Sequence, residues 1–386
     1  MTVVTVKLEK VVDILSGFAF KSELFNNSEG MPIIRIRDVV RGFSKTCYSG
    51  EFGNNFLVQN DETVIGMDGN FNVAKWKGGP ALLNQRVCKI KAREGILDDD
   101  YLFHFLPKAL KKIEDSTPFV TVKHLSVKGV KEIDIPLPTI PEQRRIAAIL
   151  DQADALRVQR REALVQLDSL TQSIFIEMFG EPVANSKEWP DSTTLGEIAQ
   201  IVSGITKGRP LNGKLARTVP YLAVANVQDK ALNLSAVKDI DATEDEIQRY
   251  KLKKNDLLLT EGGDPDKLGR GTLWNDELLE CIHQNHIFRV RLITEQLTPL
   301  FLNWLVSSQR GKKYFLRSAK QTTGIASINM TQLRSFPLLL PPMKLQQDFI
   351  RVAGVIESQQ IIQRRCLAEL DALFASLQHR AFRGEL

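Results

Sequence analysis

The sequence contains an internal repeat, which constrains its fold more than any other feature does. Segments in the first half of the 386 residues match segments in the second half in the same order. Each half has an amphipathic run ending in Ser-Gly, then a proline-led alternating run, then an apolar run behind a polar turn. The matching pairs are residues 8–17 with 195–204, 32–39 with 220–227, and 84–90 with 284–290. A repeat of about 200 residues predicts two similar globular parts, and the alternating runs predict strands.

The last segment of each half has the same length in both halves, with no insertion or deletion between them. Residues 133–138 lie 203 positions before residues 336–341. The same offset relates three pairs of identical residues, which are Gln143 and Gln346, Asp168 and Asp371, and Phe179 and Phe382. Because the earlier parts of the two halves vary in spacing and sequence, we expect a shared scaffold that carries two globular parts with different surfaces.

Both fixed segments have the apolar spacing of long helices. The first helix is predicted over residues 142–179, because Pro141 and Glu142 suit a first turn, and the second is predicted to begin at Pro342. Apolar side chains recur every three or four residues, which predicts that each helix buries a stripe against the other. The stripes are Ile146, Leu150, Ala153, Leu156, Ala163, Leu167, Leu170, Ile174 and Met178, and then Phe349, Val352, Ile356, Cys366, Leu370, Leu373 and Leu377.

The repeat also predicts how the helices run. Arg160 and Gln363 interrupt the two stripes at equivalent positions, and Gly180 and Gly384 stand just past the helix ends, as stop residues do. A pseudo-two-fold relation between the halves makes the helices antiparallel. The predicted fold class is α+β, with two mixed α/β domains joined by an antiparallel coiled-coil spacer. The predicted parts are a first domain (1–138), a first helical region (139–181), a second domain (182–341) and a second helical region (342–386).

Composition excludes several classes of protein. Hydrophobic residues make up 43% and charged residues 25%, as in ordinary globular proteins. No apolar run approaches the ~20 residues that span a bilayer, and the first residues lack the layout of a secretion signal, so we expect no membrane contact and a cytoplasmic location. The net charge of +5 permits a nucleic-acid partner without requiring one.

Two stretches resemble cofactor motifs but are incomplete. Cys281, His283 and His286 have spacing that hints at a metal site, yet no fourth ligand is evident. Residues 208–214 fit most of a phosphate-binding loop, but Leu215 stands where such a loop needs Ser or Thr. We therefore expect no metal ion and no cofactor on this chain.

Several motifs, taken together at the repeated spacing, resemble the specificity subunit of type I restriction–modification systems. They are Ile-Pro-Leu-Pro-Thr-Ile-Pro-Glu-Gln at 135–143, its degenerate copy at 338–346, the Ser-Gly pairs ending at Gly17 and Gly204, residues 122–125, and Phe-Arg-Gly-Glu-Leu at 382–386. The resemblance implies two target-recognition domains that each read one half of a gapped site in double-stranded DNA. It further implies docking of methyltransferase subunits, two in number, and of motor-nuclease subunits. S-adenosylmethionine, Mg²⁺ and ATP would bind only to those partners, and this chain would catalyse nothing.

Candidate DNA-binding residues follow from polar, basic stretches that the two halves share. Glycine-rich loops carry amides and cations that could fork onto base edges, and in this family such loops lie toward DNA. Polar pairs precede an apolar strand in each half, and further polar residues precede the last strand. The candidates are Asn70, Asn72, Lys75, Lys77, Gln85, Arg86, Lys123 and His124 in the first half, and Lys267, Arg270, Asn285, His286, Thr322 and Thr323 in the second. Exposed turn clusters or strand edges remain the alternative interpretation for all of them.

The first helix also has a basic face, which we interpret as a docking site for the methyltransferase. Its residues are Arg144, Arg145, Arg157, Arg160 and Arg161. A solvated helix surface is the alternative interpretation, since acidic residues lie between these arginines.

Two other functions remain open from the sequence. One is an enzyme in its own right, but we find neither the loop that an amino-methyltransferase needs nor a carboxylate–lysine cluster of nuclease type. The other is a structural coiled-coil adaptor, or the DNA-binding module of a methylation-only system. An adaptor does not explain why two domains share a frame yet diverge in their loops.

Overall fold

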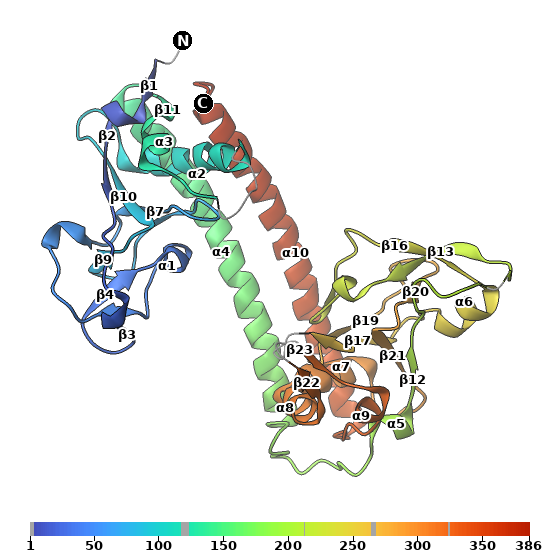
Figure 1. The fold of residues 1–386 in the computed structure, drawn as a ribbon. Helices are drawn as coiled ribbons and strands as arrows, with labels where there is room; N and C mark the ends of the chain where they lie inside the picture. The colour runs from blue at the N-terminus through green and yellow to red at the C-terminus, as the bar shows by residue number, and fades with distance from the viewer. Residues whose placement is uncertain (1–3, 117–122, 212, 264–267, 323–324) are drawn as a thin grey trace. The chain divides into compact units, whose positions relative to one another are not determined.

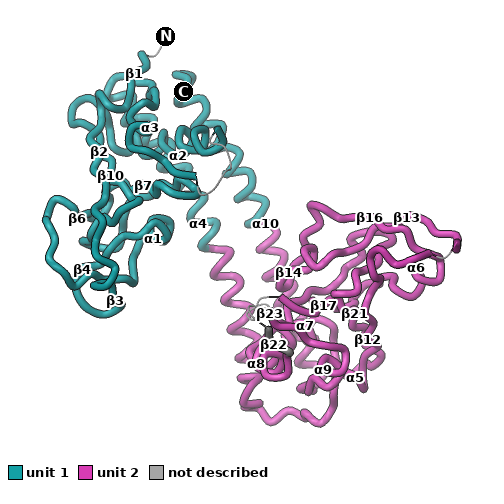
Figure 2. The backbone as a smooth tube through the Cα atoms, in the orientation of Figure 1, with its two compact units in different colours: residues 1–162, 363–386 teal, residues 163–362 magenta. Residues whose placement is uncertain are grey.

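The computed structural model describes residues 4–116, 123–211, 213–263, 268–322 and 325–386. Contacts divide the chain into unit 1, residues 1–162 with 363–386, and unit 2, residues 163–362 (Figure 2). The division falls within two long helices, α4 (Ile140–Phe179) and α10 (Met343–Ala381), so each helix contributes one segment to each unit (Figure 1). None of the helices in the described ranges is long and apolar enough to cross a membrane.

In its described residues, unit 1 contains short strands and shorter helices besides its segments of α4 and α10. The helices are α1 (Ile36–Arg41), α2 (Asp99–Ser116) and α3 (Val127–Lys131). The strands are β1 (Thr5–Lys7), β2 (Val12–Ser16), β3 (Phe25–Asn26), β4 (Met31–Ile34), β5 (Cys47–Tyr48), β6 (Leu57–Val58), β7 (Thr63–Gly66), β8 (Val73–Lys75), β9 (Ala81–Leu83), β10 (Val87–Ala92) and β11 (Asp134–Pro136).

Unit 2 is built in a similar way. Its shorter helices are α5 (Leu195–Ile198), α6 (Glu244–Tyr250), α7 (Pro299–Ser307), α8 (Gln309–Ser318) and α9 (Met330–Arg334). Its strands are β12 (Ala199–Ser203), β13 (Arg217–Leu222), β14 (Val227–Gln228), β15 (Ala231–Leu232), β16 (Lys238–Ala242), β17 (Leu257–Thr260), β18 (Gly262–Gly263), β19 (Gly271–Leu273), β20 (Ile282–His283), β21 (Ile287–Leu292), β22 (Lys320–Thr322) and β23 (Ile325–Ser327).

The two units share a sheet topology, which confirms the repeat as a repeat of fold. A four-stranded antiparallel sheet has the order β2-β10-β7-β8 in unit 1 and β12-β21-β17-β19 in unit 2. A second sheet in each unit contains one parallel pair, β4 with β9 and β13 with β20. Mixed sheets with helices packed on them are the α+β class that the sequence predicts.

The proline-led alternating runs at 32–39 and 220–227 are only partly strands, because residues 36–39 and 224–226 form helical turns instead. Strand β4 ends at Ile34, and α1 follows directly. The Asp38 carboxylate accepts the backbone N–H of Arg35 at 3.0 Å, which turns the chain. In unit 2 the Asn226 amide oxygen accepts the N–H of Ala223 at 2.8 Å in the same way. The acid or amide at the end of each run therefore starts a helical turn.

The segments of α4 and α10 are antiparallel within each unit, as predicted. In unit 1, Arg157 donates to the Asp371 carboxylate at 2.6 Å, and Arg160 donates to the Gln363 side chain at 2.9 Å. In unit 2, Gln360 donates to Asp168 at 2.6 Å. The repeat offset of 203 relates the first and third of these contacts, because Arg157 maps onto Gln360 and Asp168 onto Asp371.

A buried glutamine fastens the start of each long helix to its own unit. The Gln143 side chain is fully buried, accepts the N–H of Asp98 at 2.8 Å, and donates to the carbonyls of Ile96 (3.2 Å) and Pro138 (2.9 Å). The partners of the equivalent Gln346 are Thr298 N (2.8 Å), Gln296 O (3.0 Å) and Pro341 O (2.9 Å). The glutamine of the repeated motif thus satisfies backbone groups around the helix start, which sequence reasoning missed.

The buried stripes are shorter than the sequence predicts. Ile146, Leu150 and Ala153 are buried in the core of unit 1, whereas Leu156 and Leu170 are exposed. The sequence pattern indicates an apolar face on each helix, but it does not show what packs against that face. Two helices alone leave much of each apolar face uncovered. The middle of the helix pair therefore carries apolar side chains on its surface.

Candidate nucleic-acid interface

A tight turn joins β9 to β10 and presents two of the predicted residues, Gln85 and Arg86. Asn84 forms a parallel bridge with Phe18, and the Gln85 N–H donates to the Phe18 carbonyl at 2.8 Å. The close approach needs glycine at position 17, because a Cβ there would lie 1.9 Å from the Asn84 oxygen. Arg86 adopts a left-handed backbone with φ of 67°. The Ser-Gly motif therefore shapes this turn.

Unit 2 builds the same turn between β20 and β21. A Cβ at Gly204 would lie 1.9 Å from the His283 oxygen, and the Asn285 N–H donates to the Ile205 carbonyl at 2.9 Å. The Ser203 hydroxyl donates to the Asn285 carbonyl at 2.6 Å. Both residues of the motif act on this turn in unit 2.

In unit 1, three separate stretches of candidate residues come together at the end of β7. The Met67 N–H donates to the Arg86 carbonyl at 2.9 Å, and the Leu125 N–H donates to the Met67 carbonyl at 2.7 Å. The Gly69 N–H donates to the Lys123 carbonyl at 2.9 Å. The loop after β7, the turn before β10 and the segment before α3 therefore form one continuous surface.

A largely covered carboxylate organises the side chains of this surface. Asp68 pairs with the Arg86 guanidinium, and its Oδ1 lies 2.6 Å from Nδ1 of His124. The Asp68 side chain is 10% exposed, whereas those of Arg86 and His124 are more than half exposed. Burial raises the pKa of Asp68, but hydrogen bonds from His124 and Arg86, with their charges, outweigh it and hold that pKa below its usual value. The acid therefore stays ionised between the exposed Arg86 guanidinium and the exposed His124 imidazole.

Unit 2 has a similar arrangement with a different acid. Glu261 follows β17 as Met67 follows β7, because its N–H donates to the His286 carbonyl and its carbonyl accepts the Ile328 N–H, both at 2.9 Å. The Glu261 Oε2 lies 2.6 Å from Nδ1 of His286. The acid stands one position earlier in its loop than Asp68 does, yet it holds the equivalent residue of the turn.

The other candidates of the first loop divide into exposed and tethered side chains. Asn70 and Lys77 are exposed, and the Asn72 carbonyl accepts the Gly66 N–H at 2.8 Å.

Lys75 and Lys123 are tethered to α2. Lys75 pairs with Asp100 and lies 5.3 Å from the centre of the Phe103 ring. Lys123 donates to the carbonyl of Glu114. Both ammonium groups thus serve local structure, which the sequence did not reveal.

The remaining candidates of unit 2 are less well defined. Arg270 is partly buried and donates to the Gln228 side chain at 3.2 Å. Lys267 and Thr323 lie outside the described residues, and the backbone of Thr322 belongs to β22.

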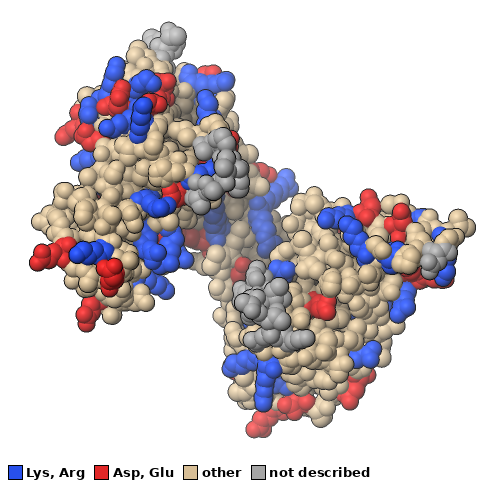
Figure 3. Space-filling view, viewed as in Figure 1, with Lys and Arg blue, Asp and Glu red and all other residues tan. Residues whose placement is uncertain are grey.

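Unit 1 has additional cations that sequence reasoning missed. Arg35, Arg37 and Arg41 lie at and within α1, which packs against β7 and β8 beside the candidate loop. Figure 3 shows Lys and Arg side chains gathered over this part of unit 1. The equivalent positions of the first two in unit 2 are Ala223 and Ala225. Three arginines within seven residues were the available signal, but the predicted strand concealed their common helix.

Arg157 and Arg160 on the basic face of α4 bind side chains of α10 within unit 1. Arg157 pairs with Asp154 (2.5 Å) and Asp371 (2.6 Å), and its guanidinium lies 4.2 Å from the centre of the Phe374 ring. Arg160 is bound to Gln363, as described above. These two arginines hold α10 rather than forming an open basic face.

The other three arginines are more exposed. Arg144 lies 3.7 Å from the Asp98 carboxylate, and Arg145 pairs with Glu142 at 2.7 Å on the same helix. Arg161 contacts α10 through an ion pair of 3.0 Å. Exposed pairs of this kind contribute little to stability, so these groups can exchange partners.

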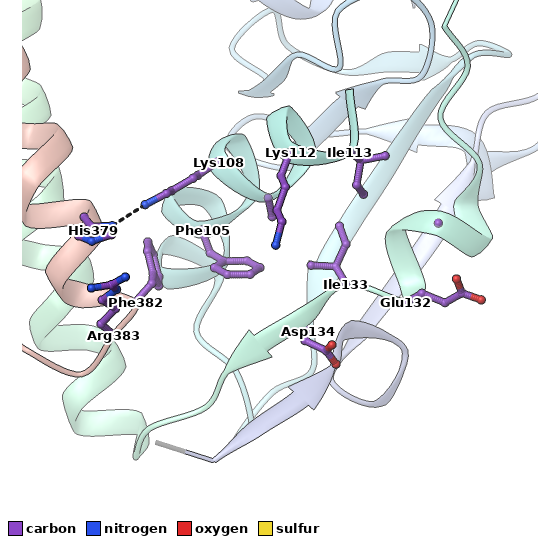
Figure 4. Close-up of a pocket in the computed structure, with 12 residues that line it drawn as sticks. Phe105, Lys108, Lys112, Ile113, Glu132, Ile133, Asp134, His379, Phe382 and Arg383 are labelled. Carbon is purple, nitrogen blue, oxygen red and sulfur yellow. Dashed lines mark hydrogen bonds between the residues drawn. The ribbon is translucent and has the colours of Figure 1, made fainter. Parts of the chain in front are cut away.

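A hollow of about 640 Å³ lies in unit 1 between α2, α3, β11 and the end of α10 (Figure 4). Phe105, Ile133 and Phe382 contribute apolar surface, and Lys108 Nζ lies 2.9 Å from His379 Nδ1 at its rim. Among the described residues, those lining it include none of the predicted DNA-binding side chains.

The Cys281, His283 and His286 spacing does not bring those side chains to one place. His283 is fully buried and its Nδ1 lies 3.0 Å from the Ile287 carbonyl, whereas His286 is exposed beside Glu261. Burial, with the charge of Arg289, lowers the pKa of His283 to about 3, so it is neutral. Within the described ranges, no three His, Cys, Asp or Glu side chains form a group that could hold a metal ion.

Known proteins resemble the chain in sequence over nearly its whole length. It is 30% identical to the type I restriction enzyme EcoBI specificity subunit of Escherichia coli, over 99% of this chain and 85% of that relative. It is 23% identical to the StySPI specificity subunit of Salmonella potsdam, over 99% of this chain and 89% of that relative.

The fold also matches solved structures. The crystal structure of a type I restriction-modification system S subunit from M. genitalium superposes with a TM-score of 0.55 at 16% identity, over 98% of this chain and 96% of the other. A chain from a study of complex assembly and conformational transition of the type I R-M system superposes with a TM-score of 0.51 at 18% identity, over 100% and 98%. At these identities the likeness concerns the fold alone.

A family model assigns both halves. The model described as the type I restriction modification DNA specificity domain matches residues 2–166 and again residues 187–364. Each match covers most of one repeat and its helix. The chain therefore belongs to the type I restriction modification DNA specificity family.

Proposed function

We propose that the chain is the DNA-recognition subunit of a type I restriction–modification enzyme and reads a two-part, gapped target in double-stranded DNA. One observation carries the proposal. In each unit, stretches far apart in sequence meet at the end of β7 or β17 and present cationic or imidazole side chains over a carboxylate. A surface of this kind can contact phosphates and base edges together.

The two units offer different chemistry to DNA, so we expect two different half-sites. Unit 1 presents Arg86, His124 and Gln85 with the α1 arginines nearby, whereas unit 2 presents His286 and Asn285 and has Ala223 and Ala225 in place of two of those arginines. Guanidinium groups favour guanine and amides favour adenine. The loops and DNA deformability also affect the choice, so residue type alone does not give the bases.

The helices support docking of two methyltransferase subunits. Val158 and Ile361 are exposed, and so are Leu170 and Leu373, and the repeat offset relates the members of each pair. Each unit therefore carries one member of each pair on its helix segments. Two equivalent apolar surfaces suit two copies of one partner, since exposed apolar patches mark protein interfaces. Motor-nuclease subunits would join that assembly, which we place in the cytoplasm.

We further propose that the chain catalyses nothing by itself. S-adenosylmethionine, Mg²⁺ and ATP would bind to the partner subunits, and this chain would supply DNA recognition and docking surfaces. The test is methyl transfer from labelled S-adenosylmethionine to target DNA. The isolated chain should give no transfer, whereas the complex should be active, and transfer by the isolated chain would contradict the proposal.

The experiment that tests recognition is selection from random duplex DNA with the complex purified through a tag on this chain. A two-part consensus with a fixed gap is the expected result. One continuous motif would mean that a single unit reads DNA, and the absence of any motif would favour a structural adaptor.

A further inference from the structure

We propose that Asp68 and Glu261 are positioning residues for base recognition, one in each unit, and that each sets the sequence preference of its own half-site. The inference rests on the proposed function. Neither acid was among the residues that the sequence predicted to contact DNA. The juxtaposition that carries it is a carboxylate bound to exposed turn residues: Asp68, 10% exposed, holds Arg86 and His124, and Glu261, 34% exposed, holds His286.

Asp68 is placed to orient Arg86 and His124 rather than to contact DNA. One carboxylate oxygen pairs with Arg86, and the other lies 2.6 Å from Nδ1 of His124. With 10% of its side chain exposed and both oxygens engaged, it has little access to a base edge. An ionised acid at this depth would also repel a phosphate, so direct backbone contact is disfavoured.

In unit 2 an acid also holds a residue of the turn, but from a different position in its loop. Glu261 replaces Asp68 and stands one position earlier, with a side chain longer by one methylene. Its Oε2 lies 2.6 Å from Nδ1 of His286, at the position in the turn that Arg86 occupies in unit 1. Two different acids at non-equivalent positions reach the same turn residue, so the pairing is not a simple consequence of repeat similarity.

Fixing these Arg and His side chains affects specificity more than affinity. An Arg or His side chain held by a carboxylate loses less freedom on binding and meets one base geometry better than others. The acid also lowers the positive potential, which weakens attraction to any phosphate regardless of sequence. Removing the acid should therefore relax selectivity while leaving non-specific binding equal or stronger. A role confined to folding predicts instead that both kinds of binding weaken.

The test uses the full complex carrying Asp68→Asn or Glu261→Gln, with DNA pools in which one half-site is randomised and the other is fixed. We expect Asp68→Asn to lower discrimination about ten-fold in one half-site and to leave the other unchanged. Glu261→Gln should do the reverse. Asp68→Glu keeps the charge and should restore part of the discrimination. Binding to unrelated DNA should stay equal or rise for both neutral variants.

Asp13→Asn is the matched control, because Asp13 forms an exposed ion pair of 3.2 Å with Arg93 in the same unit. It should select the wild-type bases in both halves. The inference is overturned if the neutral variants select the same bases as a functioning wild-type complex, or if specific and non-specific affinity fall equally. A failure of the proposed function is distinct, because the wild-type complex itself would then select no sequence.

Discussion

At the scale of residues, single glycines define the turns that carry the candidate residues. Gly17 and Gly204 allow the carbonyls of Asn84 and His283 to approach within a distance that no Cβ tolerates. The sequence showed both Ser-Gly pairs as repeated features, and the structure supplies their physical reason. The carboxylate of Asp68 could not be inferred, because its partners lie in segments that only the fold brings together.

Replacing Gly17 with Ala should destabilise unit 1. The new Cβ would lie 1.9 Å from the Asn84 oxygen, and backbone must move to relieve the clash. A cost of about 1–3 kcal/mol is expected from overpacking. Hydrogen exchange of the β10 amides in urea would measure it. Gly354→Ala is the control, because its Cβ would meet nothing within 4 Å in helix α10, and it should stabilise by up to about 1 kcal/mol. Unchanged β10 protection in Gly17→Ala would contradict the turn geometry.

Two neighbouring lysines should differ in their effect on DNA binding. Lys77 is exposed, whereas Lys75 pairs with Asp100. If Lys77 contacts a phosphate, Lys77→Ala should make the log–log salt dependence of binding shallower by about 0.9. Lys75→Ala should change the slope less, because its charge is already compensated. Titration of the complex with target DNA at several salt concentrations measures both, and equal changes would mean that Lys75 leaves Asp100 on binding.

At the scale of elements, periodicity predicted the helices well and their surroundings poorly. The spacing of apolar residues gave two long helices, and the glycines after them have positive φ, 79° at Gly180 and 73° at Gly384. The same spacing could not distinguish a side chain packed on the other helix from one that is exposed. The prediction that Leu170 and Leu373 are buried was therefore wrong. The prediction of a strand over residues 32–39 was wrong after Ile34, because the Asp38 carboxylate accepts the Arg35 N–H and starts a helical turn.

Charging an exposed apolar position should remove one partner without unfolding the chain. Leu373 is exposed, so Leu373→Asp should change the free energy of unfolding by less than about 0.5 kcal/mol. It should nevertheless weaken docking, because the charge would be buried in the interface. Native mass measurement should show one methyltransferase subunit per chain in place of two.

The equivalent change in the other unit, Leu170→Asp, should remove the other copy, and the double variant should remove both. Ala375→Asp is the control, because this exposed residue lies about 200° around the helix from Leu373. Retention of two subunits by the double variant would place the dock elsewhere.

At the scale of the whole molecule, the repeat was the most informative sequence feature because it gave the number of units, their shared frame and the direction of the helices. Symmetry carried that inference, since a pseudo-two-fold relation leaves few ways to connect two domains through two helices. The contacts Arg157–Asp371 and Gln360–Asp168 obey this relation. The side chains of the loops differ between the two halves and do not follow from symmetry. The sequence therefore predicted which segments carry candidate residues, but not which of those residues contact one another.

Lengthening both helices should change the gap of the DNA target and nothing else. Four residues inserted after Glu162 in α4 and four after Ile362 in α10, where the two units divide, add about 6 Å to each helix. Because base pairs are about 3.4 Å apart, the gap should grow by about two base pairs. Four residues make slightly more than one helical turn, so the apolar faces keep nearly the same direction. Selection with the lengthened complex should return both half-sites unaltered. New bases within either half-site would mean that the helices shape recognition itself rather than its spacing.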